Sequence, residues 1–323
     1  MQEQSRPEEK LVVAVSSRAL FNLEAENAIF EEKGVAAYRD FQSANVNTPL
    51  EPGVAFPFIK RLLSLNALFP EENEPFKVVV LSRNSPESGQ RFFASCKYHN
   101  LPIRGGAFTS GHATFPYLKA FGASLFLSAN ADSVYEATRL GYPAGLILPS
   151  KHQYREDDQS LRIAFDFDGV LIDDESQKQY ESQGLESFQS YEVKNAMSPH
   201  NAGPLTGLLK KLSYFQKLDM QKHGADNPYF NPVIRISIVT ARGAPSEERL
   251  ITTLKSWGLQ AAELFLLDGM PKHFILEELQ PHIFFDDQMT HLKTTASTVP
   301  SVWIPFGVAN ASALEKSLNE RVK

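Results

Sequence analysis

Two aspartates one residue apart, Asp166 and Asp168, are the side chains in this sequence best suited to carry chemistry. They follow an apolar run, 161–165, and precede Gly169. Such a run predicts a buried strand, and the aspartates would lie at its carboxyl end, where open α/β sheets bind ligands. Two carboxylates there can hold a hard cation while one attacks phosphorus or exchanges protons. A surface turn, which Asp and Gly also favour, is the alternative interpretation.

A second signal follows the predicted strand 234–239, which ends in Thr240, Ala241 and Arg242. A hydroxyl at a strand end, followed by the backbone N–H groups of a helix start, suits a phosphoryl oxygen. Taken alone, Thr240 is explained equally well as a helix cap. Its place after a predicted strand, downstream of the aspartate pair, favours a phosphate-binding role.

Two further signals come later in the chain. Lys272 opens a predicted helix and can reach back into a site as a point charge, although a lone lysine is commonly solvated. The predicted strand 282–285 ends in Asp286 and Asp287. These carboxylates would complete an acidic set of metal ligands opposite Asp166 and Asp168.

The elements that would position these side chains occur twice. At a shift of 150 residues Gly34 corresponds to Gly184, and at a shift of 158 residues Arg91 corresponds to Arg249. Each copy alternates apolar strands with amphipathic helices, a pattern typical of parallel βαβ units. We therefore predict an α/β protein made of two related Rossmann-like parallel-sheet lobes that arose by internal duplication.

The polar stretch 150–160 predicts a linker, which gives lobes at 1–155 and 156–323. The segment 174–203 separates the first strand of the second lobe from its helix. Because this segment is short and polar, we expect a small helical cap there.

The first lobe lacks the chemical groups of the second. The residues at the corresponding positions are Ser16, Arg18, Ser82, Thr114 and Ser128. Without carboxylates or the lysine, this lobe is predicted neither to bind Mg²⁺ nor to form an aspartyl-phosphate. It would serve as a scaffold, complete the substrate pocket or hold a regulatory ligand, with Thr109 and Gly111 as the expected contacts.

Composition narrows the class of protein. The chain has 323 residues, 42% hydrophobic content and a formal net charge of −6, with a pI near 5.8. The absence of a dense basic stripe argues against binding a nucleic acid polymer. No apolar run approaches a membrane span, and the N-terminus lacks the core of a signal peptide. A lone cysteine, Cys96, excludes an internal disulfide and indicates a reducing, cytoplasmic setting, with Cys96 itself as buried helical filler.

Together, these motifs resemble the four motifs of the haloacid-dehalogenase superfamily of phosphotransferases. The match narrows to the cytosolic 5′-nucleotidase type I family and runs from about Leu11 to Val308. The segments that carry it are FDFDGVLIDDES at 165–176, VTAR at 239–242, PHIFFDDQ at 281–288, AVSSRALF at 14–21 and YLKA at 117–120.

This resemblance implies a Mg²⁺-dependent hydrolase of nucleoside 5′-monophosphates, with AMP or IMP as substrate. It makes Asp166 the nucleophile and Asp168 the general acid and base, whose backbone carbonyl also contacts the metal ion. By the same resemblance Thr240 and Lys272 hold the phosphoryl oxygens, with Asp286 or Asp287 as a metal ligand. Asp174 and Ser176, at the start of the cap, become candidates for leaving-group contacts, although a solvated helix start explains them equally well.

Three alternatives stay open at this stage. The enzyme could act on sugar phosphates or another small phosphomonoester, or the chain could be a nucleotide-binding regulatory protein. The first lobe could have a structural role, such as a dimer interface. Two hypotheses about partners accompany these alternatives: the first lobe binds a nucleotide effector, and the chain forms a homo-oligomer.

Overall fold

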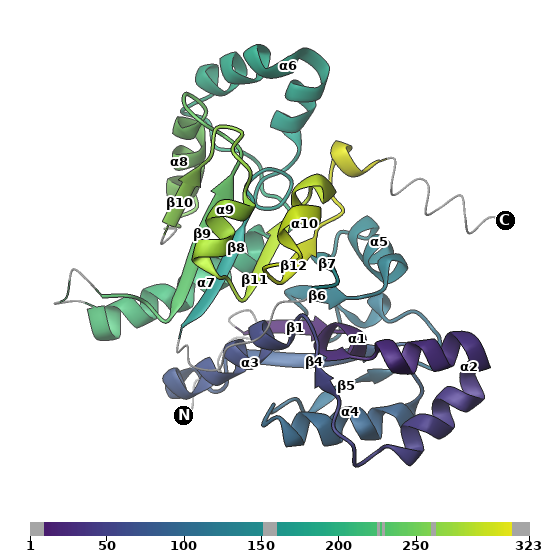
Figure 1. Ribbon diagram of the computed structural model, residues 1–323. Helices are drawn as coiled ribbons and strands as arrows, with labels where there is room; N and C mark the ends of the chain where they lie inside the picture. The colour runs from purple at the N-terminus through teal and green to yellow at the C-terminus, as the bar shows by residue number, and fades with distance from the viewer. Residues whose placement is uncertain (1–9, 151–159, 225–226, 228–229, 260–262, 312–323) are drawn as a thin grey trace. The chain divides into compact units, whose positions relative to one another are not determined.

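The computed structural model describes residues 10–150, 160–224, 227, 230–259 and 263–311. The chain folds into two compact units, 1–147 and 148–323. Each unit is an α/β structure built around a parallel sheet, as predicted (Figure 1). Residues 151–159 of the predicted linker, with the lobe boundary predicted at 155, lie outside the described residues.

The sheet of the first unit has the strand order β7-β6-β1-β4-β5. Its central strand β1 is buried at every position, because the sequence LVVAV offers an apolar side chain to both faces. Val13 of β1 pairs with Val78 of β4 and with Leu125 of β6. The strands are β1 (Leu11–Val15), β4 (Phe76–Ser82), β5 (Gly105–Phe108), β6 (Leu125–Ser128) and β7 (Ala144–Ile147), and a small antiparallel pair is formed by β2 (Phe21–Asn22) and β3 (Glu51–Pro52). The helices are α1 (Ser17–Leu20), α2 (Glu24–Ala44), α3 (Phe56–Ser64), α4 (Pro86–Tyr98) and α5 (Ala131–Arg139).

The sheet of the second unit has the order β10-β9-β8-β11-β12. Its central strand β8 pairs in parallel with β9 and β11, so that Ile163 lies beside Ile236 and Ile283. The strands are β8 (Leu161–Phe165), β9 (Ile234–Thr240), β10 (Glu263–Leu266), β11 (Ile283–Asp286) and β12 (Ser301–Trp303). The helices are α6 (Glu175–Lys194), α7 (Thr206–Asp219), α8 (Glu247–Ser256), α9 (His273–Leu279) and α10 (Met289–Thr295).

The two units agree in details that an α/β pattern alone does not require. Helix α2 is broken at Gly34 (φ 78°, ψ −177°), and helix α6 is broken at Gly184 (φ 79°, ψ −176°). In the first unit Arg91 Nε donates to the carbonyl of Thr48 at 3.0 Å, and in the second Arg249 Nε donates to the carbonyl of Ser198 at 2.9 Å. The corresponding residues in the predicted repeat therefore have the same local structure.

Two predictions from the sequence, on the segment 174–203 and on Cys96, can be compared with the fold. The segment 174–203 contains the kinked helix α6, which accounts for its predicted helical character. Cys96 lies in α4 and is buried, as expected, and burial raises the pKa of its thiol to about 12. A thiol held protonated in this way is unsuited to nucleophilic chemistry.

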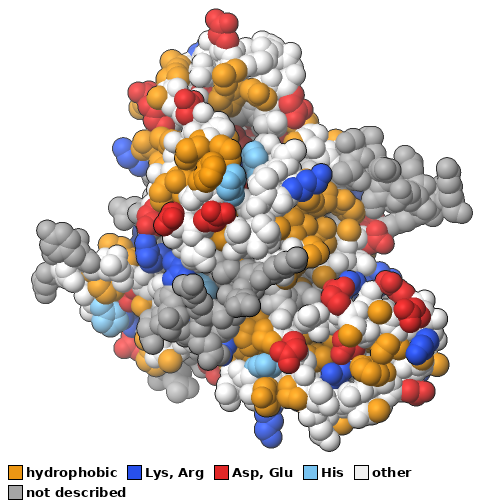
Figure 2. Space-filling model, viewed as in Figure 1, with side chains coloured by type: hydrophobic (Ala, Val, Ile, Leu, Met, Phe, Trp, Pro, Cys, Tyr) orange, Lys and Arg blue, Asp and Glu red, His pale blue; other side chains and the backbone are white. Residues whose placement is uncertain are grey.

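The surface fits the composition. On the face shown in Figure 2, acidic and basic side chains are interspersed with apolar ones. No helix within the described ranges is long and apolar enough to cross a membrane.

Candidate active site

Three carboxylates meet at the carboxyl edge of the second sheet. Asp166 follows β8, Asp286 is the last residue of the adjacent strand β11, and Asp287 comes next. The backbone N–H of Asp166 donates to the carbonyl of Phe285 at 2.8 Å, which extends the pairing of the two strands to the site. All three side chains are buried. The structure therefore brings together three of the four predicted metal ligands.

Lys272 lies between two of these carboxylates. Its Nζ is 2.8 Å from Oδ1 of Asp166 and 2.7 Å from Oδ2 of Asp286. The residue stands at the N-cap of α9, and its side chain is buried. Burial alone would lower the pKa of Lys272, but the two carboxylates outweigh burial and raise that pKa above its ordinary value. The lysine is thus a fixed positive charge inside the cluster.

One lysine does not balance three buried carboxylates. Burial raises the pKa of Asp166 to about 6, against the opposing effect of Lys272. Burial and the charges of Asp166 and Asp286 raise the pKa of Asp287 well above its usual range. Burial also acts to raise the pKa of Asp286, but Lys272 and His291 outweigh it and lower that pKa. The cluster therefore carries an excess of negative charge that a bound cation would relieve.

The donor set could hold a metal ion. Ligand atoms of Asp166, Asp286 and His291 all lie within 4.8 Å of one another. Oδ1 of Asp287 is buried and accepts no hydrogen bond from the described residues. Gly169 leaves room for this carboxylate, since a Cβ there would lie 2.5 Å from Oδ2 of Asp287. Buried carboxylate oxygens, one of them without a donor, are suited to a metal ion.

His291 was not found by sequence reasoning. Its Nδ1 lies 3.2 Å from Oδ2 of Asp286, because α10 begins just after β11 and turns His291 back toward the strand end. Its place five residues after the end of β11 is the only signal in the sequence, and many solvated histidines share such a spacing.

The carboxylate of Asp168 binds Arg242. Nε of Arg242 is 2.8 Å from Oδ2 of Asp168, and Nη2 is 2.7 Å from Oδ1, so the pair is bidentate. Cζ of the guanidinium lies over the rings of Phe167 and Phe188, 5.2 Å from each centroid. Arg242, predicted from sequence as a phosphate contact, is therefore engaged within the protein.

Glu192 of α6 joins Arg242 to a buried network that sequence reasoning also missed. Its carboxylate accepts from Arg242, from Arg249 at 3.0 Å, from Ser176 at 2.8 Å and contacts His200 at 3.1 Å. Burial alone would raise the pKa of Glu192, but His200 and Arg242 outweigh burial and lower the pKa to about 2. The network ties α6 to the end of β9 and to α8.

The other predicted substrate contacts of this unit differ from one another in burial and in hydrogen-bond partners. Thr240 is buried at the end of β9, where its hydroxyl accepts from the backbone N–H of Arg242 at 3.2 Å, while Ala241 is exposed in the loop that follows. Ser176 is fully buried against Glu192. Asp174 is half-buried, contacts Lys178 at 2.8 Å and accepts from the backbone N–H of Val308 at 2.9 Å. Ser176 thus serves the internal network in this arrangement.

Thr109 and Gly111 lie in the first unit. The hydroxyl of Thr109 donates to the carbonyl of His112 at 2.6 Å, and the N–H of Gly111 donates to the carbonyl of Arg83 at 2.6 Å. Gly111, with a φ of 94°, lines a pocket of that unit. These contacts form the loop between β5 and the following helical turn.

Comparison with known proteins identifies the family of this chain. Residues 3–311 match the family model described as 5′-nucleotidase. Human Cytosolic 5′-nucleotidase 1B is 36% identical over 293 residues, which cover 89% of this chain and 47% of the human protein. The chain therefore spans about half the length of that curated relative. No solved structure matches the chain significantly.

Proposed function

Because this chain belongs to the 5′-nucleotidase family, we propose that it hydrolyses nucleoside 5′-monophosphates to nucleoside and phosphate. The observation that carries the proposal is the buried arrangement of Asp166, Lys272 and Asp286 at the sheet edge. A carboxylate beside a fixed cation can attack phosphorus while the cation holds the phosphoryl oxygens. The family resemblance makes AMP and IMP the expected substrates.

The architecture supports a more detailed proposal about the two lobes. They descend from one duplicated unit, of which the second is a haloacid-dehalogenase-like catalytic core with a small cap at 174–203, and the first is non-catalytic. The equivalent strand orders and the paired helix breaks at Gly34 and Gly184 support common descent. The position of α6 directly after the β8 loop supports its role as the cap.

Mg²⁺ is the proposed cofactor, since the donor set is dominated by carboxylate oxygens. Asp166, the backbone carbonyl of Asp168, and Asp286 or Asp287 would hold it, with His291 close enough to Asp286 to orient that ligand. When bound, the ion would offset the negative charge that gathers on the phosphoryl group during attack.

The proposed reaction has two steps. In the first, a carboxylate oxygen of Asp166 attacks phosphorus, the bond from phosphorus to the 5′-oxygen breaks, and that oxygen takes a proton from Asp168. In the second, Asp168 accepts a proton from water as the water oxygen bonds to phosphorus. The bond to Asp166 then breaks, which releases phosphate and restores both aspartates.

Lys272 and Thr240 would hold the phosphoryl oxygens during both steps. Lys272 stays charged because its two carboxylate neighbours raise its pKa. Arg242 donates to both oxygens of Asp168 and so fixes the orientation of this carboxylate. Arg242 is therefore a positioning residue for the proposed acid.

The exposure of the other predicted substrate contacts suggests a role for each. Ala241 offers exposed backbone next to Thr240 for the phosphate, and Asp174 remains the proposed contact for the leaving nucleoside. Ser176 would act by holding Glu192, and Arg242 by holding Asp168. We also propose a cytoplasmic location, a nucleotide effector and self-association. The first of these agrees with the name of the human relative, a cytosolic 5′-nucleotidase.

Phosphate release from a panel of substrates tests the proposed function. AMP, IMP, GMP, CMP, UMP, ribose 5-phosphate and glucose 6-phosphate would be compared with and without Mg²⁺. We expect metal-dependent release from AMP or IMP well above the sugar phosphates. Equal or faster release from the sugar phosphates would overturn the substrate assignment, and release that survives complete metal removal would overturn the cofactor assignment.

A further inference from the structure

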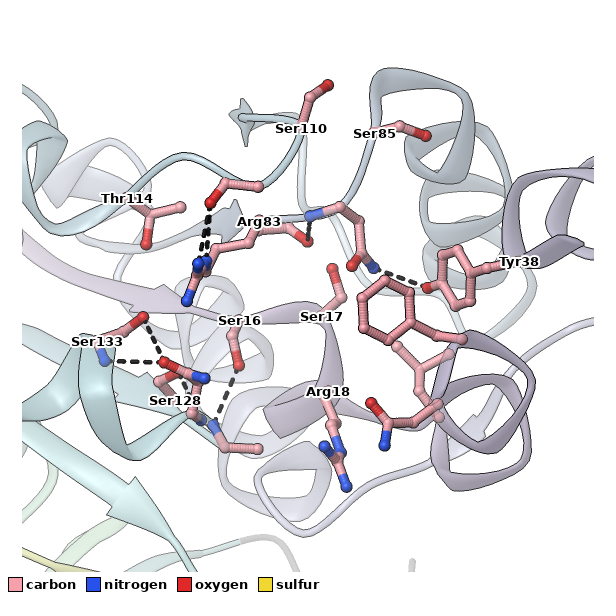
Figure 3. A pocket seen from close by; sticks show the side chains of 18 of the residues that line it. Ser16, Ser17, Arg18, Tyr38, Arg83, Ser85, Ser110, Thr114, Ser128 and Ser133 are labelled. Carbon is pink, nitrogen blue, oxygen red and sulfur yellow. Dashed lines mark hydrogen bonds between the residues drawn. The ribbon is translucent and has the colours of Figure 1, made fainter. Parts of the chain in front are cut away.

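The first unit contains a cavity where the second unit has its carboxylate cluster. The cavity measures about 430 Å³ and opens at the carboxyl edge of the sheet (Figure 3). Ser16 follows β1, Ser82 closes β4 and Ser128 closes β6, and all three line it. In the predicted repeat these positions correspond to Asp166, Thr240 and Asp286. Small hydroxyl side chains have thus replaced larger charged or branched ones, which accounts for the open space.

The lining of this cavity is positively charged. Arg18, Arg39 and Arg83 contribute to it, and none of the residues that line it is Asp or Glu. Arg83 follows β4 and donates from Nε and Nη2 to the carbonyl of Gly111 at 3.1 and 3.0 Å, while Arg18 pairs with Glu24, an exposed residue outside the lining, at 2.6 Å. Figure 3 shows these two arginines approaching from different strand ends, with Ser16 between them. Arg39 lies 4.0 Å from Glu87, which is also outside the lining. A lining that contains arginines and no acidic residue favours an anionic ligand.

Hydroxyl groups supply donors at the base of the cavity. Ser17 Oγ is buried and has no hydrogen-bond partner among the described residues, although buried hydroxyls are usually paired. The hydroxyl oxygens of Ser82 and Ser128 each accept a backbone N–H at 3.1 Å, from Asn84 and Asn130 respectively. Their own hydrogens can then donate into the cavity. An unpaired buried hydroxyl beside such donors points to a ligand with several acceptor oxygens.

The other side of the cavity is apolar. Leu23, Phe30, Val35 and Tyr38 line it, and the rings of Phe30 and Tyr38 lie 6.1 Å apart at nearly a right angle. Phe30 is 46% exposed, so much of its ring is in contact with water. A planar or apolar group against these rings would bury surface that is otherwise in contact with water. The ligand therefore combines an anion with an organic part.

We propose that this pocket is a second ligand site, which binds a phosphate ester carrying a planar organic group, such as a nucleoside monophosphate. The phosphate would lie among Ser16, Ser17, Arg18 and Arg83, with the organic group against Phe30 and Tyr38. The site needs no metal ion, because its arginines supply the positive charge. It does not hydrolyse the ester, since Ser16 replaces the carboxylate nucleophile. This proposal does not depend on the reaction assigned to the second unit.

Calorimetric titration of the full chain tests the site. The Asp166→Asn variant, which is not expected to turn over substrate, would be titrated in EDTA with AMP, ribose 5-phosphate and inorganic phosphate. We expect binding of AMP that persists in EDTA, with ribose 5-phosphate weaker and inorganic phosphate weakest. Equal binding of all three would reject the role of the aromatic wall, and the absence of AMP binding in EDTA would reject the site.

Variants in the first unit test whether AMP binds in this cavity. Arg83→Ala removes an exposed cation, and Ser16→Asp places a negative charge where the phosphate would lie. Each should weaken AMP binding in EDTA by about 10- to 100-fold. Arg104→Ala is the matched control, because Arg104 is an exposed arginine of the same unit that does not line the cavity. Circular dichroism would verify folding of each variant, and wild-type affinity in Arg83→Ala would overturn the proposal.

Discussion

The carboxyl edges of the two sheets share one geometry and differ in charge. In the second unit the strand ends present Asp166, Asp286 and Asp287, packed around buried Lys272. In the first unit the same edge presents serines and arginines around a cavity. The backbone that positions these side chains is alike in both units, since strand order and helix breaks correspond. The fold thus sets where the groups lie, and a few strand-end residues decide what they can do.

A second difference concerns the arginine that anchors the long helix of each unit. Arg91 binds Glu26 at 2.8 Å and the amide oxygen of Gln42 at 3.1 Å. Arg249, its counterpart, binds Glu192, which also binds Arg242. Glu192 corresponds to Gln42 in the repeat. The second unit therefore has a negative charge at this position, where it also has a second arginine, Arg242, to bind. In the second unit, Glu192 therefore also binds Arg242, which in turn binds Asp168.

The largest expected effect comes from removing the proposed nucleophile. Asp166→Asn keeps the shape of the side chain but cannot form the acyl-phosphate, so phosphate release should fall by about 10⁴-fold or more. Initial rates with AMP and Mg²⁺ measure it. Asp40→Asn, an exposed aspartate of the first unit, is the control and should retain the wild-type rate. Substantial turnover by Asp166→Asn would show that the two sheet edges do not differ in the way proposed.

Loss of Lys272 should affect stability as well as rate. Lys272→Ala leaves Asp166 and Asp286 buried without their shared cation, which should cost about 3–5 kcal/mol of unfolding free energy in EDTA. Saturating Mg²⁺ should restore part of that loss, because the ion binds only the folded site. Urea unfolding with and without Mg²⁺ measures both effects. If the variant were as stable as the wild type in EDTA, the cluster could not carry the excess negative charge inferred for it.

Glu192→Gln would make the second unit resemble the first. The folded-state pKa of Glu192 is about 2, below its ordinary value of 4.5, so the unfolded state binds more protons between these values. The carboxylate therefore contributes stability above about pH 4.5 that is lost as the pH falls toward 2. The variant should lose about 3 kcal/mol at pH 7 and show a weaker pH dependence in that acid window.

Urea unfolding from pH 2.5 to 7 checks the effect of Glu192→Gln. Glu181→Gln, at an exposed position of the same helix, is the control and should keep the acid-side slope of the wild type. An unchanged slope in Glu192→Gln would contradict the assignment of this stability to Glu192. The rate at pH 7 should also fall, since Arg242 would lose one of the two carboxylates that hold it beside Asp168.

The proposed catalytic residues could be predicted from sequence because each one ends a strand or starts a helix. Asp166, Thr240, Lys272 and Asp286 follow local patterns that fix their position along a parallel sheet, and these residues were found without knowledge of tertiary contacts. Glu192 and His291 were missed because each lies on a helix, where only the packing of that helix tells which face meets the site. The pairing of Arg242 with Asp168 was also missed, since a strand-end arginine fits a phosphate contact equally well.

The cavity of the first unit shows the same limit. The sequence indicated that hydroxyls and an arginine replace the catalytic groups, but not that the smaller side chains leave an open space. Volume depends on whether neighbouring side chains move in to fill a gap, which pattern alone does not determine. Here Phe30 and Tyr38 of α2 border the space without closing it.

The smallest expected effects come from substituting two corresponding glycines, Gly34 and Gly184. Comparing their effects on stability tests directly how alike the two units are. Gly34 and Gly184 adopt φ values of 78° and 79° with extended ψ, a conformation open essentially to glycine alone. A Cβ at either position would meet no atom within 4 Å, so Gly34→Ala and Gly184→Ala should each destabilise the chain through backbone strain alone, by about 1–3 kcal/mol. Gly207→Ala, in helix α7 with open space and an ordinary φ, should be neutral or stabilising. Urea unfolding would compare the three. A cost at one kink without a cost at the other would mean that the shared helix break is retained for different reasons in the two units.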